Sequence, residues 1–378
     1  MERLHSLTGV QAAFCRHPQR YQRSRHGRRS AHGVSIALTA HRLLAIETSC
    51  DETAAAVVRD GRAVLSSVVS SQIALHAPHG GVVPELAARA HLENIAPVVD
   101  AALAVLPGGW DDVDAVAVTR GPGLIGCLLV GTLFAQSAAL ARRLPIVGVS
   151  HLAGHVYSAW LSDADLEPPF LALVVSGGHT DCVQLHEHGS ATHLASTRDD
   201  AVGEAFDKVA RLLGLPYPGG PAIQRAAATG DPTRFRLPAT RIESGFSFSG
   251  LKTAVRYVVR DLGPEHLGED GVPRDSETIA ALAAAFQAAA VDQLIAGLDE
   301  AVERTGAERI AVVGGVAANT ALRAAVRDRF RGLTVVVPPL ELCTDNAAMI
   351  GAAGWQRLRL HGPDPLGFDA DPGLAAFA

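Results

Sequence analysis

Cysteine is scarce in this sequence, and its spacing excludes two common classes of small domain. Five cysteines lie far apart in 378 residues, at positions 15, 50, 127, 182 and 343, and no two form a CxxC pair. An odd number of widely separated cysteines builds neither a disulfide framework nor a zinc ribbon. The pattern is typical of a protein in a reducing compartment, so we predict a cytoplasmic location.

The sequence also lacks an excess of positive charge and a secretory signal. The formal net charge is −6, which argues against a generally basic nucleic-acid-binding protein and leaves any RNA contact to a local patch. Residues 1–41 differ from the rest, because they contain seven arginines and a single acid, Glu2, without an apolar h-region. This segment is interpreted as a transit peptide, a disordered RNA-contacting arm or, favoured among the three, the product of a start codon assigned too early. The folded protein is predicted to begin near Arg42.

One uncharged run has about the minimum length of a membrane span. Residues 124–141 carry no charge, but they include Thr132, Gln136 and Ser137 and lie between two predicted strands. A buried crossover helix of an α/β protein explains such a run better than a membrane helix. We predict no membrane insertion.

Two segments about a hundred residues apart show the same strand–turn–strand pattern. In residues 43–58 and 170–185, an apolar run ends in Ser, Thr or Gly and a second β-prone run follows. Each is predicted to form a hairpin. Tight turns of this kind direct backbone N–H groups into one concavity, which suits phosphate binding. Two such copies predict two similar lobes facing each other across a nucleotide cleft.

The remaining strands and helices alternate along the chain, which predicts an α/β architecture with mixed sheets. We expect a first lobe over residues 42–150, a second lobe over 151–345, and a C-terminal helix and tail over 346–378 that can pack back on the first lobe. The first lobe is predicted to contain strands near 43–48, 54–59, 63–69, 115–119 and 145–149, and helices at 84–106 and 124–141. The second is predicted to contain the 170–185 hairpin, helices at 201–213 and 276–305, a Pro/Gly loop at 215–221, and strands at 309–313 and 334–337.

A pair of histidines follows the strand that ends the first predicted lobe. His151 and His155 are four residues apart in a segment that looks like a helix start, with Ser150 as its N-cap. This spacing places both imidazoles on one helix face, where they can chelate one divalent metal. Two solvated or hydrogen-bonded histidines are the alternative. A zinc peptidase of the HExxH type needs Glu after the first histidine, and Leu152 stands there.

Asp345 offers a third ligand at a predicted strand-to-helix junction, where the active-site residues of α/β proteins collect. Its alternative role is a helix N-cap. Two histidines and one carboxylate with open positions form a ligand set common for Fe(II), and zinc can also use it.

A series of motifs in order along the chain resembles one family. They include IETSCDET at 46–53, HLAGH at 151–155, SGGHT at 176–180, GGVAANTALR at 314–323 and CTDNAAMIG at 343–351. Together they make the chain similar to the bacterial tRNA N6-adenosine threonylcarbamoyltransferases, the TsaD family, once called Gcp or O-sialoglycoprotein endopeptidase. The resemblance runs from about Leu43 to Gly351.

The resemblance implies a fold, a reaction and a set of site residues. The implied fold is the two-lobed α/β fold of actin, Hsp70 and sugar kinases (ASKHA), with a nucleotide cleft between the lobes. The implied reaction moves the threonylcarbamoyl group of threonylcarbamoyl-AMP to N6 of the adenosine 3′ of the anticodon, position 37, in tRNAs that read ANN codons, forming t6A. By motif position, one divalent metal, Fe(II) or else Zn(II), is held by His151, His155 and Asp345. The adenylate is held by Val174, Val175, Ser176, Gly177, Gly178, Asp207, Gly220 and Asn319.

The acyl donor of this reaction is already activated, so no covalent acyl-enzyme is needed, and the metal can act as a Lewis acid. The acceptor amine is a poor nucleophile, and His179, Asp51 and Glu52 are candidates for a base. Gln224 departs from the acidic residue that many relatives carry there.

The resemblance further implies partners: tRNA, a TsaB-like paralogue and a TsaE-like ATPase. Three interpretations compete with the transferase. One is a non-catalytic ASKHA scaffold subunit of the same tRNA-modification complex, and another is a metallopeptidase, which the missing glutamate disfavours. The third, an ATP-hydrolysing kinase of the same fold, would leave the histidine pair unexplained.

Overall fold

The computed structural model describes residues 11–12, 42–238 and 245–377. The interpretation of residues 1–41 as an extension therefore lies outside the described residues, except at strand β1 (Gln11–Ala12), whose backbone pairs antiparallel with β4 (Ala63–Ser71).

The first lobe is built on a six-stranded mixed sheet with the order β1-β4-β3-β2-β5-β6. The further strands are β2 (Arg42–Glu47), β3 (Glu52–Arg59), β5 (Ala115–Gly121) and β6 (Ile146–Ser150). β2, β3 and β4 form an antiparallel meander. β5 pairs in parallel with β2, and β6 pairs in parallel with β5. The hairpin predicted for residues 43–58 is confirmed.

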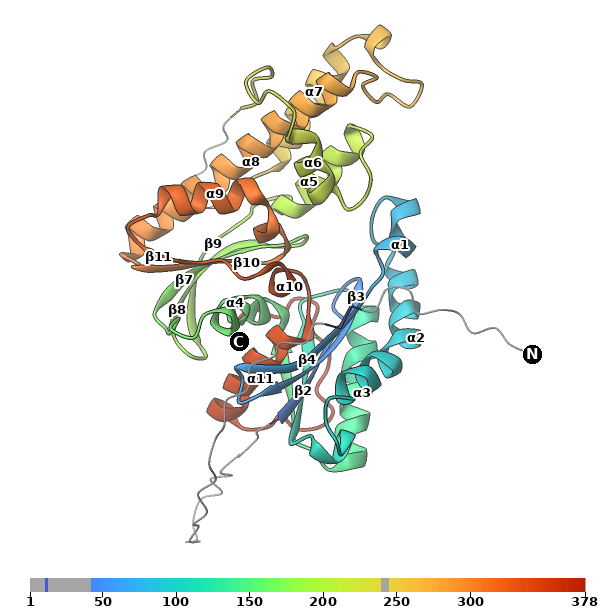
Figure 1. Ribbon diagram of the computed structural model, residues 1–378, viewed down its shortest axis with the longest axis vertical. Helices are drawn as coiled ribbons and strands as arrows, with labels where there is room; N and C mark the ends of the chain where they lie inside the picture. The colour runs from blue at the N-terminus through green and yellow to red at the C-terminus, as the bar shows by residue number, and fades with distance from the viewer. Residues whose placement is uncertain (1–10, 13–41, 239–244, 378) are drawn as a thin grey trace, which may run out of the picture.

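Alternation along β2 shows how this sheet is covered on both faces. Leu44 and Ile46 face the core formed with α2 (Pro84–Leu103) and α3 (Ile125–Arg142), the two helices predicted from the sequence. Leu43 and Ala45 face α11 (Ala347–His361), the last helix of the chain. Figure 1 shows α11 against the first sheet, on the side away from α2 and α3. The chain end is thereby built into the first lobe.

The second lobe repeats the strand order of the first. Its five-stranded sheet has the order β11-β10-β7-β8-β9, again a meander of three strands followed by two parallel ones. Without β1, the strands of the first sheet follow the same order along the chain as those of the second. The prediction of two similar lobes is therefore confirmed. The strands are β7 (Phe170–Val175), β8 (Thr180–Glu187), β9 (Ser190–Ser196), β10 (Arg309–Val313) and β11 (Thr334–Val336).

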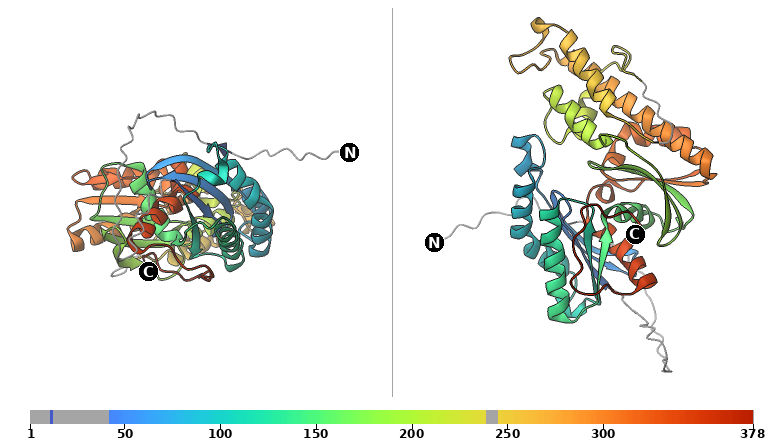
Figure 2. Two further views of the ribbon diagram at one scale, coloured as in Figure 1. Left: turned by 90° about the horizontal axis from the view of Figure 1, so that it is seen from below. Right: turned by 180° about the vertical axis from the view of Figure 1, so that it is seen from behind.

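The two faces of the second sheet meet different helices. Leu171, Leu173 and Val175 contribute to the core with α5 (Val202–Leu212) and α8 (Ser276–Thr305), whereas Ala172 and Val174 contact α4 (His151–Ser162). Helix α4 lies between the lobes and contributes side chains to the cores of both. Figure 2 shows the second sheet between its helices from a second side.

Smaller elements complete the fold. They are α1 (Ile73–His76), α6 (Gly219–Ala227), α7 (Ser249–Asp261), α9 (Thr320–Arg329) and α10 (Leu340–Cys343), with 3-10 turns η1 (Ala77–His79), η2 (Gly109–Asp112), η3 (Pro264–His266) and η4 (Gly315–Ala318). The sequence predicted neither β9 nor α7, and α6 begins inside the predicted Pro/Gly loop of residues 215–221.

Two helices, α3 and α8, are long and apolar enough to cross a membrane by length and composition alone. In the structure α3 connects the parallel strands β5 and β6 and packs on β5, as the sequence predicts for a crossover helix. α8 packs within the core of the second lobe. Both therefore have a structural role within the fold.

The chain after α11 returns across the first lobe to the second. The Asp364 amide donates to the Ile146 carbonyl (2.8 Å), and the Asp371 amide donates to the Arg120 carbonyl (2.9 Å). Phe377, the last described residue, packs against Tyr157 of α4, with ring centroids 6.4 Å apart. We call residues 363–377 the C-terminal tail.

Candidate active site

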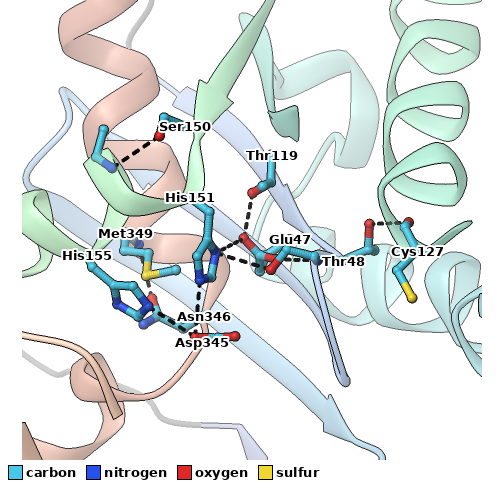
Figure 3. A network of polar contacts seen from close by, with 12 residues as sticks. Glu47, Thr48, Thr119, Cys127, Ser150, His151, His155, Asp345, Asn346 and Met349 are labelled. Carbon is cyan, nitrogen blue, oxygen red and sulfur yellow. Dashed lines mark hydrogen bonds and ion pairs between the residues drawn. The ribbon is translucent and has the colours of Figure 1, made fainter. Parts of the chain in front are cut away.

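The structure brings the three predicted metal ligands together between the lobes. His151 and His155 occupy the first turns of α4, which Ser150 caps by accepting from the Ala153 amide (3.5 Å). Asp345 lies between α10 and α11, and its Oδ1 is 3.6 Å from His151 Nε2 and 3.2 Å from His155 Nε2. One ligand atom from each residue fits within 4.8 Å of the others. In Figure 3 both imidazoles point toward the Asp345 carboxylate.

His155 supplies the observation that tests whether these residues fit a metal. Its side chain is fully buried; among the described residues Nδ1 has no hydrogen-bond partner, and Nε2 faces only the Asp345 carboxylate, 3.2 Å away. A buried polar atom left unpaired is costly. A cation held by Nε2 and Asp345 would bridge these two groups, and two imidazoles with one carboxylate form a donor set suited to Fe(II) or Zn(II). The residues present therefore fit a divalent metal.

Glu47, the last residue of β2, supports this cluster from behind. Its buried carboxylate accepts from Thr119 Oγ1 and from the Ser49 amide, both at 2.5 Å, and lies 3.0 Å from His151 Nδ1 (Figure 3). A carboxylate on the second ring nitrogen fixes the tautomer and orientation of a ligating histidine. The sequence analysis assigned Glu47 no role. The sequence could have indicated it, because Glu47 is an acidic residue that directly follows the apolar run of β2.

Charges within the cluster shift the pKa values of its members. Burial opposes ionisation of Asp345, but His151 and His155 outweigh it and hold the pKa of this carboxyl well below its usual range. Burial likewise disfavours the imidazolium of His151, yet Asp345 and Glu47 raise its pKa to about 9. The pKa of Glu47 is lowered, because His151 and the Ser49 contact overcome its burial. Two buried carboxylates thus stay ionised and favour a positive charge between the imidazoles.

The three candidate bases lie in different surroundings. Glu52 has a pKa well above its usual value, because it is buried and lies beside Asp51. Asp51 contacts the second lobe through Tyr217, whose hydroxyl lies 3.5 Å from Oδ2. His179 follows the turn between β7 and β8, and burial lowers its pKa, so its imidazole is neutral at pH 7. His179 is therefore the candidate best suited to accept a proton.

The turn of residues 176–179 leaves two glycines open to a ligand. The Ser176 amide donates to the His179 carbonyl (2.9 Å), and the His179 amide donates to Ser176 Oγ (3.1 Å), which closes the turn. Gly177 and Gly178 are exposed, and a Cβ on either would meet nothing within 4 Å. Val174 and Val175 precede them as buried residues of β7. The two glycine amides are thus available to a ligand.

Asp207, Gly220 and Asn319 lie on the α5 side of the second sheet. Asp207 Oδ1 accepts from the Gly219 amide (2.7 Å) and ties α5 to the start of α6, where Gly220 leaves open space. Asn319 caps α9, and its Nδ2 donates to Gln287 (2.8 Å). Gln224 accepts from the Thr320 amide (2.7 Å), so its side chain serves the same helix terminus.

Replacing Gly203 by Ala is expected to distort the turn of residues 176–179. Gly203 opens α5 beside the turn, where a Cβ would lie 2.5 Å from the Ser176 carbonyl oxygen and 2.8 Å from Gly177 Cα. Both contacts are with backbone, so we expect Gly203→Ala to lower the free energy of unfolding by about 1–3 kcal/mol in urea denaturation. Gly332→Ala is the control, because nothing lies within 4 Å of a Cβ there. Equal stability of the two variants would contradict the prediction.

Comparison with family models adds a match over most of the chain. Residues 63–352 match the TsaD model, described as tRNA N6-adenosine threonylcarbamoyltransferase. A protein of that name from Anaeromyxobacter dehalogenans is 51% identical over 340 residues, which cover 88% of this chain and 98% of the relative. Another, from Geobacillus thermodenitrificans, is 48% identical over 342 residues, covering 88% of this chain and 96% of the relative.

Solved structures with low sequence identity show the fold alone. Full-length HypF in its phosphate- and nucleotide-bound form superposes with a TM-score of 0.58 at 12% identity, covering 86% of this chain and 57% of HypF. HypF of T. kodakarensis gives the same TM-score and identity, covering 84% of this chain and 48% of that protein. The predicted ASKHA-type α/β fold is confirmed.

Proposed function

The chain belongs to the tRNA N6-adenosine threonylcarbamoyltransferase (TsaD) family, and from that premise we propose how its own residues perform the reaction. The enzyme transfers the threonylcarbamoyl group of threonylcarbamoyl-AMP to N6 of the adenosine at position 37 of tRNAs that read ANN codons, forming t6A. The observation that carries the proposal is the grouping of His151, His155 and Asp345 between the lobes, with the open glycine turn of residues 176–179 following on β7. A scaffold subunit would not need this set, and a peptidase of the HExxH type lacks its base at Leu152.

His151, His155 and Asp345 are proposed to hold one divalent metal, Fe(II) or else Zn(II), with Glu47 orienting His151. When bound, such an ion acts as a Lewis acid toward the carbamoyl carbonyl oxygen. The support is the donor set itself, two imidazoles and a carboxylate, together with the buried Nδ1 of His155, which has no hydrogen-bond partner among the described residues.

The adenylate is proposed to lie along the turn and the α5 face of the second lobe. The amides of Gly177 and Gly178 would donate to its phosphate, where negative charge grows as AMP leaves. Asp207 keeps Oδ2 for a ribose hydroxyl while Oδ1 holds Gly219. Gly220 and Asn319 would border the adenosine, and the buried Val174 and Val175 hold the strand that carries the turn.

The proton of the acceptor amine is proposed to pass to His179. In the step, N6 of the acceptor adenosine forms a bond to the carbamoyl carbon, the bond from that carbon to the phosphate oxygen breaks, and AMP departs with the electron pair. His179 takes the proton from N6, because its imidazole is neutral. Asp51 and Glu52 lie in the same region from the first lobe, where the raised pKa of Glu52 makes it a poorer acceptor.

The experiment that tests the function is a transfer assay. The protein, its partner proteins, synthesised threonylcarbamoyl-AMP and an ANN-decoding tRNA are combined, and the nucleosides are analysed by mass spectrometry. Formation of t6A that depends on this chain supports the transferase. No product, in a mixture where the adenylate and the partner proteins are shown to bind, would point to the scaffold instead.

We also propose a cytoplasmic location without membrane insertion, and assembly with a TsaB-like paralogue and a TsaE-like ATPase. A row of apolar side chains on α2 and α3 supports a protein partner. Ile125, Leu129, Leu133 and Leu140 project from α3 with 41–65% of their surface exposed, and Leu92 of α2 is 65% exposed. Exposed apolar side chains repeated along neighbouring helices are typical of an interaction site.

Replacing Leu133 by Glu is expected to weaken binding of the TsaB-like paralogue at least tenfold, because it places a charge in the middle of this face. The fold should be unchanged, since Leu133 is 59% exposed. Leu360→Glu is the matched control, a half-exposed leucine on α11. Calorimetric titration measures both affinities, and equal affinities would exclude α3 from the interface.

A further inference from the structure

A cavity beneath the C-terminal tail has no ligand assigned to it so far. It has a volume of about 400 Å³, within the range of small-molecule sites, about 300–1,000 Å³. Val174 and Val183 of the second sheet form one wall, Leu374 and Phe377 of the tail form another, and Leu152 of α4 also lines it. The tail therefore completes an apolar pocket between the lobes.

The cavity reaches the proposed reaction centre at His179. His179, the proposed proton acceptor, lines it, and Leu152 directly follows the metal ligand His151. His179 also directly follows Gly177 and Gly178, whose amides are proposed to bind the adenylate phosphate. A molecule bound in the cavity would thus lie next to His179, the residue proposed to take up the proton in the reaction.

The cavity and the adenylate site lie on opposite faces of the second sheet. Val174 belongs to the face that packs on α4, whereas Leu173 and Val175 belong to the face that packs on α5. Asp207 of α5 and Asn319, which caps α9, lie on the α5 side. An acyl transfer needs its nucleophile to reach the carbonyl carbon without crossing the space of the leaving AMP. An acceptor in the cavity and an adenylate on the α5 side would approach the turn of residues 176–179 from opposite faces of the sheet. The acceptor then does not cross the space of the leaving AMP.

The lining also indicates which substrate the cavity suits. A purine base is flat and largely apolar on its faces, and enzymes hold an extruded base between apolar side chains with a few polar groups at its edge. Here the polar groups are His179 and the paired His193 and Asp181, whose Nε2 and Oδ1 are 2.9 Å apart. We propose that this cavity receives the acceptor adenine of the tRNA anticodon loop, with N6 directed toward His179. The proposal rests on the transferase function.

Filling the cavity tests this assignment. Ala191 lines it from β9 and is partly exposed, so Ala191→Trp can occupy the space without entering the main core. Ser190→Trp is the matched control, because the neighbouring position is exposed and does not line the cavity. We expect Ala191→Trp to raise the KM for tRNA at least tenfold and to leave the Kd of a non-hydrolysable adenylate analogue unchanged. Ser190→Trp should change neither.

A direct binding probe complements the kinetics. In an anticodon stem-loop with 2-aminopurine at position 37, the base lacks the N6 amine and reports its removal from the loop stack by a rise in fluorescence. We expect this rise with the parent assembly and with Ser190→Trp, and little of it with Ala191→Trp. Ala376→Trp, which fills the cavity from the tail, is the second variant should Ala191→Trp fail to fold.

Each other outcome overturns the assignment. A raised Kd for the adenylate analogue with an unchanged KM for tRNA would give the cavity to the donor substrate. Unchanged values for both substrates in a folded Ala191→Trp or Ala376→Trp protein would exclude the cavity from substrate binding. A parent protein that forms no t6A while it still raises the fluorescence of the probe would instead contradict the transferase function, so the two failures are distinguishable.

Discussion

Replacing His155 by Ala is expected to abolish metal binding and to lower the rate of threonylcarbamoyl transfer on the order of 10³-fold. Lewis-acid polarisation of a carbonyl group supplies several kcal/mol, and each 1.36 kcal/mol is a factor of ten in rate, so roughly 10³ follows from its loss. His155 is the most informative ligand to remove, because among the described residues the only polar contact of its ring is with Asp345, itself a proposed ligand.

The same property makes the variant interpretable. Since the ring of His155 contacts no polar group but Asp345 in the described part of the chain, and His151 still lies 3.6 Å from that carboxylate, the variant protein should fold. Metal content by elemental analysis and t6A by mass spectrometry measure the two effects. His186→Ala is the control, an exposed histidine of β8 paired with Thr192. A His155→Ala protein that retains full metal content and full activity would remove the metal from the proposal.

Local patterns were enough to predict the frame that carries this site. The two hairpins, the crossover helix of residues 124–141 and the helix over 276–305 follow from apolar runs of suitable length and from the turn residues between them. Strand β9 escaped prediction for a physical reason. Its residues are exposed or only partly buried, with Thr192 and His193 among them, so it shows no alternation of apolar and polar residues.

Long-range contacts set the limit of prediction at the site. The spacing of His151 and His155 lies within one helix and is readable from the sequence. Asp345 reaches them from 190 residues further on only because α11 packs against the first sheet and α4. Its inclusion therefore needed the junction pattern and the family resemblance. The contact of Glu47 with His151 joins a strand end to a helix start 104 residues away, and no local period encodes it.

Replacing Glu47 by Gln is expected to weaken metal binding by roughly 10–100-fold, the usual effect of changing the outer partner of a ligating histidine. Glutamine has nearly the same shape, so packing at the end of β2 should persist. Its amide carries no charge, and its single oxygen cannot accept from Thr119, Ser49 and His151 together as the two carboxylate oxygens do. His151 would lose the group that fixes its ring orientation.

Competition with a chromophoric chelator measures the metal affinity of this variant directly, without reference to activity. Glu187→Gln, at the exposed end of β8, provides a charge-matched control that should bind metal like the parent. Ser49 Oγ also lies near His151 Nδ1, at 3.2 Å. A Glu47→Gln protein with unchanged metal affinity would therefore assign the orientation of His151 to Ser49, and a Ser49→Ala variant should then show the loss that Glu47→Gln did not.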